Sequence, residues 1–458
     1  MKITFFGAAG GVTGSKHLLE VGQQKVLLDC GFFQGRRAQS YEANSKLPEK
    51  LKQVNNVILS HAHADHCCSL PLLVKNGYNQ PIYTTPATAD IARLIMLDAA
   101  KIQENDYRWL QKKGIKSPYP PIYSEYEVEK TAHLFHDVDY NTEYKINHQL
   151  SFKFYDAGHI LGSAVTLIKT AKKNIIYTGD LGNVGLPILP DPEHVPEEAE
   201  ILICESTYGN RNHPPVGDAY KIIKEAIVKT VKEKSRIIVP AFALGRTQEL
   251  IYILHKLHKE GEIPEIPIYV DSPLSNSITD VFKKYKVDFD EETWDEFINQ
   301  GKSPFSFNKL NYVRTTAESK MLNNKLGPLM IIASSGMMEG GRVLHHLRNN
   351  ISNPKTRILL TGYQAENTLG RKVENGDKIV KIYGEEFIVR AKILKLEELS
   401  AHADQDALIK YIESVKGLKK VFLVHGENEA TTALAELVKK RRPDLEVIIP
   451  KLGETFNL

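Results

Sequence analysis

Short apolar runs separated by glycine-containing turns make up most of residues 2–60. Runs of this length, bounded by turn residues, are typical of buried β-strands. From residue 69 to about residue 131 the pattern favours helices, and apolar runs of strand length then return up to Cys204. The first part of the chain is therefore predicted to consist of strands, then helices, then strands again.

After Glu205 the pattern changes to alternating strands and helices. Helices are predicted at residues 219–232 and 247–257, and strands at 237–239, 268–270, 329–333 and 357–360. Such alternation is the signature of a parallel sheet covered by helices. The segment 286–311, which is rich in charged and aromatic residues, fits neither pattern, and we expect it to be a mobile surface segment.

The composition is that of a globular protein large enough for two domains. The chain has 458 residues, of which 42% are hydrophobic and 25% are charged. A net charge of +3 and a pI near 8.3 do not by themselves indicate nucleic-acid binding, so an anionic substrate would need a local basic groove.

No apolar run reaches membrane-spanning length and no signal peptide opens the chain, so we expect a cytoplasmic protein without membrane contact. Reduced thiols are expected at Cys30, Cys67, Cys68 and Cys204.

Three histidines and an aspartate lie within six residues, directly after the apolar run 57–60. They are His61, His63, Asp65 and His66. If the strand continues, its period of two puts His66 on the opposite side from the other three. If it breaks into a loop, the four side chains can converge in two groups. Imidazole nitrogens and carboxylate oxygens suit zinc, and a mixed set tolerates two neighbouring divalent ions, so we predict a metal site rather than a solvated polar turn.

Three later strands run into loops that each carry one further candidate ligand. His159 follows the strand predicted at 152–156, Asp180 follows 175–178, and His425 follows 421–424. Each loop contains glycine, which lets the backbone approach a metal closely. A single histidine at a strand end is more often structural, but together with the first motif these residues complete a metal shell.

These motifs resemble those of the metallo-β-lactamase superfamily, over the whole chain and in family order. Asp29 matches the first motif, a carboxylate beside the metals. Glu205 resembles the acidic motif that opens a β-CASP insert, and His402 and His425 resemble the second and third histidine motifs of that branch. The chain is similar to β-CASP ribonucleases, nearest to bacterial and archaeal homologues of the 73-kDa subunit of the cleavage and polyadenylation specificity factor. DNA-directed members usually lack a histidine at the third motif, so His425 favours RNA.

The resemblance implies an α/β fold, in which a metallo-β-lactamase αββα sandwich contains an inserted β-CASP domain. His402 and His425 belong with the metals of the first domain, although they follow the alternating region. We therefore expect the first domain at residues 1–207 and 386–458 and the inserted domain at 208–385.

Two zinc ions are the cofactors that the resemblance implies, with Asp180 bridging them. Such a pair supplies a nucleophile at neutral pH and stabilises phosphate oxygens. Asp29 is expected to hold a ligand histidine or a neighbouring amide. The other implied ligands form two sets: His61, His63 and His159 for one ion, and Asp65, His66 and His425 for the other.

The implied catalytic residues are His402, Glu205, Asp65 and Asp180. We expect His402 to protonate the leaving 3′-oxygen and Glu205 to fix its tautomer and charge. The alternative role for His402 is phosphate binding alone, because both roles require the same position.

The expected reaction is hydrolysis of single-stranded RNA to 5′-phosphate and 3′-hydroxyl ends, by internal cleavage and also from the 5′ end. A homodimer or RNA-processing proteins are the expected protein partners. The competing hypotheses are a thioester or lactone hydrolase of the same superfamily, a DNA-directed β-CASP nuclease and a non-catalytic RNA-binding subunit.

Three strand ends in the inserted region lead into loops that contain glycine and arginine, at residues 239–246, 333–342 and 361–371. Loops at the carboxyl ends of parallel strands commonly bind ligands. Glycine lets backbone amides reach a phosphate, and arginine adds a bidentate donor. The loops also match those that line the RNA channel in β-CASP proteins, except that Asn367 stands where relatives often carry glycine. Against the alternative of simple packing, the predicted phosphate-binding residues are Arg246, Ser335, Gly336, Arg342 and Arg371.

Overall fold

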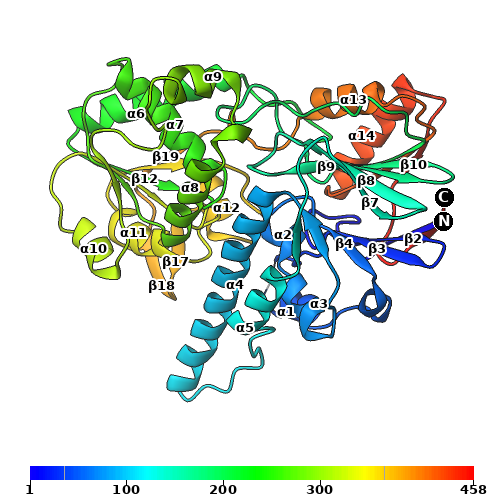
Figure 1. Ribbon diagram of the computed structural model, residues 1–458. Coiled ribbons are helices and arrows are strands. Elements are labelled where there is room, and N and C mark those ends of the chain that lie inside the picture. The colour runs from blue at the N-terminus through cyan, green and yellow to red at the C-terminus, as the bar shows by residue number, and fades with distance from the viewer. Residues whose placement is uncertain (36, 366) are drawn as a thin grey trace. The chain divides into compact units, whose positions relative to one another are not determined.

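The chain forms two compact units (Figure 1). The computed structural model describes residues 1–35, 37–365 and 367–458. The first unit comprises Met1–Val184, Asp191–Asn212 and His402–Leu458, and the second comprises Gly185–Pro190 and His213–Ala401. These limits differ from the expected domain limits at 207 and 385, in part because residues 392–395 form a strand in the sheet of the second unit. Within the described ranges, no helix is both long and apolar enough to cross a membrane.

The first unit contains two seven-stranded mixed sheets in the described residues. In the first sheet, neighbouring strands are antiparallel from β22 through β1 and β2 to β3, and parallel from β3 through β4 and β5 to β6. Strand β22 joins the C-terminal segment to β1, so the two ends of the chain lie side by side (Figure 1). The strands are β1 (Lys2–Phe5), β2 (His17–Val21), β3 (Gln24–Leu28), β4 (Asn56–Ile58), β5 (Ile82–Thr84), β6 (Phe135–Asp137) and β22 (Thr455–Asn457).

The second sheet has the order β21-β20-β11-β10-β9-β8-β7. It is antiparallel from β7 to β10 and parallel from β10 to β21. Its parallel part delivers the carboxyl ends of β10, β11 and β20 to one edge, where three predicted site residues follow. The strands are β7 (Glu143–Asn147), β8 (Leu150–Asp156), β9 (Ala164–Thr170), β10 (Asn174–Tyr177), β11 (Ile201–Glu205), β20 (Lys420–Val424) and β21 (Glu446–Ile448).

The two sheets bury a shared apolar core, to which Phe5, Phe152 and Phe422 contribute fully buried rings. Alternation along β8 puts Phe152 and Phe154 into this core, as expected for a strand with one buried face. Helices accompany both sheets: α1 (Arg37–Asn44), the 3₁₀ turn η1 (Glu49–Gln53), α2 (Ala64–Cys67), α3 (Leu70–Lys75), α4 (Pro86–Lys112), α5 (Glu125–Ala132), α13 (Gln405–Ser414) and α14 (Asn428–Arg441).

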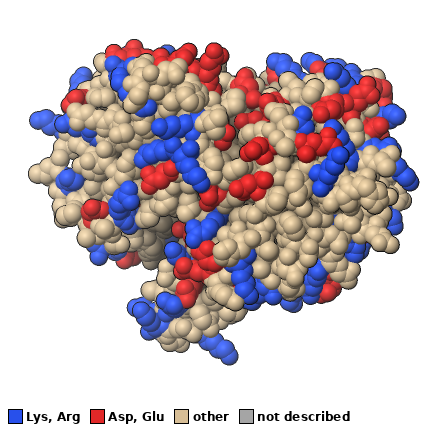
Figure 2. All heavy atoms as spheres, viewed as in Figure 1, with Lys and Arg blue, Asp and Glu red and all other residues tan. Residues whose placement is uncertain are grey.

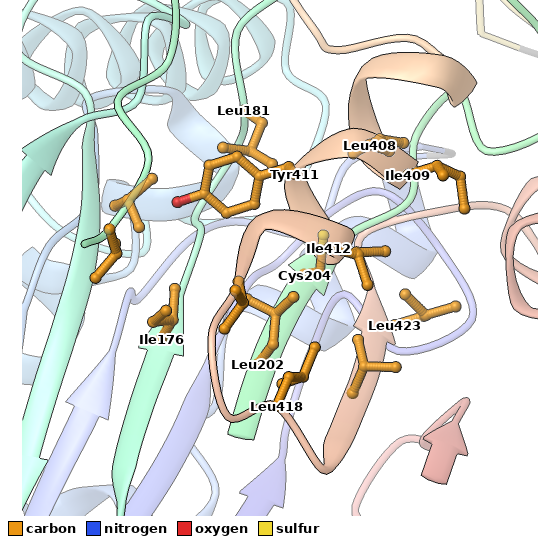
Figure 3. Close-up of a cluster of buried hydrophobic side chains, with 14 of the residues drawn as sticks. Ile176, Leu181, Leu202, Cys204, Leu408, Ile409, Tyr411, Ile412, Leu418 and Leu423 are labelled. Carbon is orange, nitrogen blue, oxygen red and sulfur yellow. The ribbon is translucent and has the colours of Figure 1, made fainter. Parts of the chain in front are cut away.

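A second apolar cluster fills the space between α13 and the outer face of the second sheet. Leu408, Tyr411 and Ile412 recur at helical spacing, and Figure 3 shows them over Ile176 and Leu202 of the sheet. Helix α13 begins where the Asp404 side chain accepts a hydrogen bond from the Ala407 amide at 2.9 Å. The cluster therefore anchors the segment that carries His402 directly onto the sheet that carries Asp180.

The second unit is built on a parallel sheet of six strands in its described residues, in the order β14-β13-β15-β12-β16-β19. Its core places Val343 and Leu347 of α11 against Ile238 and Ile358 of the sheet. The strands are β12 (Arg236–Pro240), β13 (Ile268–Val270), β14 (Leu310–Tyr312), β15 (Leu329–Ala333), β16 (Arg357–Leu360) and β19 (Lys392–Lys395), with a separate hairpin of β17 (Ile379–Ile382) and β18 (Glu385–Ile388). The helices are α6 (Val216–Lys232), α7 (Arg246–Lys259), α8 (Pro273–Lys284), α10 (Thr316–Leu322), α11 (Arg342–Asn350) and α12 (Leu369–Glu374).

The prediction that residues 286–311 form a mobile surface segment is wrong in one respect. Aromatic side chains of this segment are buried in the second unit. It forms the short turns η2 (Lys286–Asp288), α9 (Glu291–Thr293) and η3 (Trp294–Ile298) before β14. Phe297 and Phe305 are fully buried, and Phe297 packs edge-on against Tyr252 of α7. The sequence pattern did not reveal this role, because the buried aromatics Phe289, Phe297 and Phe305 are eight residues apart, too far to form the short period of a strand or a helix.

Candidate metal centre

The first histidine motif begins where strand β4 ends. Backbone hydrogen bonds from Ser15 to the Asp65 carbonyl at 2.8 Å and from Cys30 to the His66 carbonyl at 2.7 Å hold the short helix α2 against neighbouring segments. His61 and His63 thus lie in the loop, whereas Asp65 and His66 lie on the first turn of α2. Of the two arrangements considered, the one with two groups of side chains is observed.

The first group consists of His61, His63, His159 and Asp180. His63 Nδ1 lies 3.2 Å from the Nε2 atoms of both His61 and His159. Asp180 Oδ2 lies 3.3 Å from His61 Nε2 and 3.6 Å from His159 Nε2. Four donor atoms therefore point to one small volume.

The second group consists of Asp65, His66 and His425, and the other oxygen of Asp180 reaches it. His425 Nε2 lies 3.1 Å from His66 Nε2 and 3.4 Å from Asp65 Oδ2. Asp180 Oδ1 lies 3.3 Å from His66 Nε2. One carboxylate thus reaches both groups.

The spacing of these donor atoms fits zinc. Ligands about 2.0–2.1 Å from a tetrahedral zinc ion lie about 3.3–3.4 Å from one another, which is close to the separations above. Asp180 Oδ1 is buried, and no described residue donates a hydrogen bond to it. A buried carboxylate oxygen without a donor is costly unless a cation fills the site. Nitrogen and carboxylate oxygen are also the donors that zinc prefers.

Burial sets the charge state of the first group. It lowers the pKa of His63 to about 3 and brings the pKa of His61 well below its usual value, with neighbouring histidines adding to the effect at His61. Both imidazoles are therefore neutral near pH 7, which is the form that binds metals.

The loops that carry His159 and Asp180 meet at close range. A Cβ atom on Gly182 would lie 2.0 Å from the Gly158 carbonyl oxygen, so glycine is required at residue 182 for this approach. The Gly182 amide donates a hydrogen bond of 2.8 Å to the Ala157 carbonyl. Glycine therefore lets the loops after β8 and β10 approach each other closely.

Asp29 lies behind the second group, fully buried. Its Oδ2 atom is 2.6 Å from His66 Nδ1, which directs His66 Nε2 toward the other donors. Its Oδ1 atom accepts a hydrogen bond of 2.7 Å from the Ser60 amide. Asp29 thus contacts both a candidate ligand histidine and a neighbouring amide.

His402 lies at the rim of the first group. Its Nδ1 atom is 3.1 Å from Glu205 Oε1 and 4.0 Å from Asp180 Oδ2. Burial disfavours the imidazolium, but the carboxylates of Glu205 and Asp180 outweigh this effect and raise the pKa of His402. Glu205 is itself held by the Leu181 amide, 2.6 Å from its Oε1. A bridge between Gly182 and His402 in the backbone sets the ring beside the Asp180 loop.

The predicted arginines of the second unit already have acidic partners there. Arg342 Nη1 lies 2.6 Å from the buried Asp271 Oδ1, and Arg371 Nη1 lies 2.8 Å from Glu374. Arg246 is buried and pairs with Glu249. Arg246 and Arg371 each keep a buried Nε donor that reaches no acceptor among the described residues. Phosphate binding by these arginines stays a prediction, and the contacts favour Arg246 and Arg371 over Arg342.

The loop residues predicted with them are engaged locally. Ser335 Oγ accepts a hydrogen bond of 3.1 Å from the Glu339 amide, and the Gly336 carbonyl accepts one of 3.2 Å from Gln364. Asn367 has the left-handed conformation, with φ of 67°, that a glycine there would adopt readily. Its neighbour in the loop, residue 366, lies outside the described residues. Figure 2 shows basic and acidic side chains interspersed on one face of the molecule, without a uniformly basic field.

Three family models match the chain in succession. A metallo-β-lactamase superfamily domain matches residues 18–183, a β-CASP domain matches 247–373, and a Zn-dependent metallo-hydrolase RNA specificity domain matches 387–450. Ribonuclease TTHA0252 of Thermus thermophilus is 36% identical over 456 residues, which cover 99% of each chain. The chain belongs to the β-CASP ribonucleases of the metallo-β-lactamase superfamily. The predicted family, fold class and hydrolase class are thereby confirmed.

Other comparisons agree with this assignment. An RNase J-like protein of Methanocaldococcus jannaschii is 31% identical and matches 92% of this chain and 91% of its own length. The crystal structure of a protein of unknown function from Enterococcus faecalis superimposes with a TM-score of 0.56 at 15% identity, covering 100% of this chain and 99% of that chain. This last likeness concerns the fold alone.

Sequence reasoning missed several residues that contact the candidate ligands or Asp29. Ser60 Oγ lies 3.0 Å from His61 Nδ1, and Thr207 Oγ1 lies 3.2 Å from His425 Nδ1. The Tyr177 hydroxyl donates to Asp29 Oδ2 at 2.6 Å. Each missed residue adjoins a quoted motif, so the available signal was a hydroxyl next to a ligand or a strand end.

Proposed function

We propose that this protein is a two-zinc ribonuclease that hydrolyses phosphodiester bonds of single-stranded RNA to 5′-phosphate and 3′-hydroxyl ends. Internal cleavage is the main mode, with 5′-to-3′ exonucleolytic cleavage as a second mode. The observation that carries the proposal is the pair of donor groups joined by the two oxygens of Asp180, with His402 beside them. The names of the ribonuclease relatives support RNA as the substrate.

The residues that would hold the two ions follow from the two groups. His61, His63 and His159 serve one ion, Asp65, His66 and His425 serve the other, and Asp180 serves both. Bound zinc ions make water a stronger nucleophile at neutral pH and stabilise charge on phosphate oxygens. Asp29 keeps His66 in the tautomer that presents Nε2, because its carboxylate accepts the Nδ1 proton.

His402 supplies the proton that the leaving 3′-oxygen needs. Glu205 accepts a hydrogen bond from Nδ1, so the imidazolium directs its second proton, on Nε2, away from Glu205. The negative carboxylates nearby favour this charged form before the reaction. Glu205 therefore acts through His402, as an orienting and charge-stabilising residue.

The experiment compares cleavage of matched single-stranded RNA, single-stranded DNA and duplex RNA by protein whose zinc content has been measured. We expect about two zinc ions per chain, by the ligand count above, and cleavage of single-stranded RNA in preference to both other substrates. Removal of zinc with a chelator should abolish cleavage, and adding zinc back should restore it.

The new RNA ends identify the reaction. Product 5′ ends should accept label from a polynucleotide kinase only after phosphatase treatment, because hydrolysis leaves a 5′-phosphate. A circular RNA substrate tests internal cleavage, since it has no end for an exonuclease. Preference for DNA at equal salt, or 3′-phosphate products, would refute the proposed reaction.

A further inference from the structure

Behind the metal centre, buried hydrogen bonds continue away from His66. Asp29 Oδ2 lies 2.6 Å from His66 Nδ1 and 2.6 Å from the Tyr177 hydroxyl. The Tyr177 hydroxyl lies 3.1 Å from Ser15 Oγ, which in turn lies 3.3 Å from His17 Nε2. None of these hydrogen-bonded residues is more than 1% exposed. These hydrogen bonds thus connect a candidate metal ligand to the interior of the sandwich.

The hydrogen bond between Tyr177 and Asp29 has a defined direction. The Tyr177 hydroxyl donates its hydrogen bond to Asp29 Oδ2. Burial raises the pKa of Tyr177 well above its usual value, and Asp29 adds to the shift, so the hydroxyl keeps its proton. The same Asp29 oxygen also accepts from Ser60 Oγ at 2.7 Å. Three donors, including His66, therefore converge on one oxygen atom.

The position of that oxygen controls the His66 ring. An aspartate has two rotatable side-chain bonds, and the residue itself is in a left-handed conformation, with φ of 59°. The Tyr177 hydroxyl approaches from the last residue of strand β10, and Asp180 lies in the loop that follows this strand. It thereby fixes Asp29 relative to the strand that supplies the shared carboxylate. His61 is one contact further from that oxygen than His66, because it reaches Asp29 only through the Ser60 hydroxyl.

We propose that Tyr177 is a positioning residue for the second group of ligands, acting through Asp29 to hold the ring of His66 in the metal-binding orientation. The inference rests on the proposed two-zinc function and adds a residue that no sequence motif indicated. It makes an asymmetric prediction: loss of the Tyr177 hydroxyl should weaken the ion held by His66 more than the ion held by His61, His63 and His159.

The test is the variant Tyr177→Phe, which removes the hydroxyl and keeps the ring in the core. The chain offers a matched control in Tyr155→Phe. Tyr155 is also a buried tyrosine of the second sheet whose hydroxyl donates to a carboxylate, that of Glu197, and it contacts no proposed ligand. Zinc affinity is measured for the full-length proteins by chelator competition, with zinc stoichiometry from native mass spectrometry.

For Tyr177→Phe we expect one of the two zinc ions to bind about 10–100-fold more weakly, as is usual when a residue behind a ligand is removed, and the other to change less than about threefold. Absorption spectra of the cobalt-substituted protein should change for one of the two sites. Tyr155→Phe should bind both ions as the wild type does, whatever its effect on thermal unfolding. Ser15→Ala should weaken the same ion as Tyr177→Phe, but by less.

Unchanged affinities in Tyr177→Phe would overturn the inference while leaving the two-zinc function intact. Equal weakening of both ions in both tyrosine variants would also overturn it, because the effect would then be general destabilisation. A wild-type protein that binds fewer than two zinc ions would overturn the proposed function, and the inference with it, before any variant is compared.

Discussion

Both units carry polar side chains in the loops and first helical turns that follow strands, but these side chains have different partners in the two units. In the first unit, seven such side chains converge, and Asp180 Oδ1 has no donor among the described residues. In the second unit, Arg246, Arg342 and Arg371 each have an acidic partner within the same unit. A polar residue after a strand is therefore not sufficient to indicate a ligand site. Whether the side chain already has a partner within its own unit is more informative about ligand binding.

Among the variants that test this comparison, Asp180→Ala has the largest expected effect. One carboxylate serves both groups, so we expect loss of both zinc ions and of all RNA cleavage above the background rate. Zinc content and cleavage are measured on the same preparation, and circular dichroism checks that the variant is folded. A folded variant that retains two zinc ions and full turnover would remove Asp180 from the ligand set.

The next largest effect is expected for His402→Ala. It should keep both zinc ions but cut RNA about a hundredfold to ten-thousandfold more slowly, the usual range for a missing general acid. The measurement is repeated on a nitrophenyl phosphodiester or a 3′-S-phosphorothiolate linkage, whose leaving group needs no proton. A general-acid variant should recover much of its deficit on these substrates. Equal deficits on both kinds of substrate would instead assign His402 to phosphate binding.

Arg342→Ala tests whether an arginine of the second unit is structural. Arg342 also lies 3.3 Å from the Arg314 carbonyl, so it links Asp271 at the end of β13 to the segment that follows β14. Its removal leaves a buried carboxylate with fewer donors, and we expect the free energy of unfolding of the second unit to fall by about 2 kcal/mol.

The matched control for that variant lies on the same helix. Arg348 pairs with Glu385 at the surface, where both side chains are exposed. Arg348→Ala should therefore change stability by less than about 1 kcal/mol. Chemical denaturation measures both variants. If Arg342→Ala is as stable as the control but binds RNA more weakly, Arg342 is a phosphate contact rather than a structural link.

The smallest expected effect is that of Arg371→Ala. Its Nη1 atom pairs with Glu374, while its Nε donor reaches no acceptor among the described residues. We expect weaker RNA binding, unchanged zinc content and a salt dependence that flattens by about one unit of slope or less. Binding is measured at several salt concentrations, with Arg348→Ala as the control. Wild-type affinity and slope in Arg371→Ala would indicate that this loop does not contact RNA.

The sequence by itself determined the ends of the strands and the identity of the candidate ligands. Alternation of apolar and polar residues located β8, and the alternation of strands and helices predicted the parallel sheet of the second unit. The spacing of His61, His63, Asp65 and His66 predicted a metal site. These features are local, because a strand end and a short motif depend on residues close together in the chain.

The tertiary structure alone determined which distant side chains contact one another. The contact between Asp29 and Tyr177 joins residues 148 positions apart, and that between Asp271 and Arg342 joins residues 71 apart. The burial of Phe297 and Phe305 likewise depends on distant helices, since Phe297 packs against Tyr252 of α7 and Phe305 against Phe282 of α8. No local pattern encodes such pairs, because their energy comes from packing and desolvation that arise only when distant segments meet. Whether a polar side chain finds a hydrogen-bond partner is therefore decided by the fold, as for Arg342 and for Asp180 Oδ1.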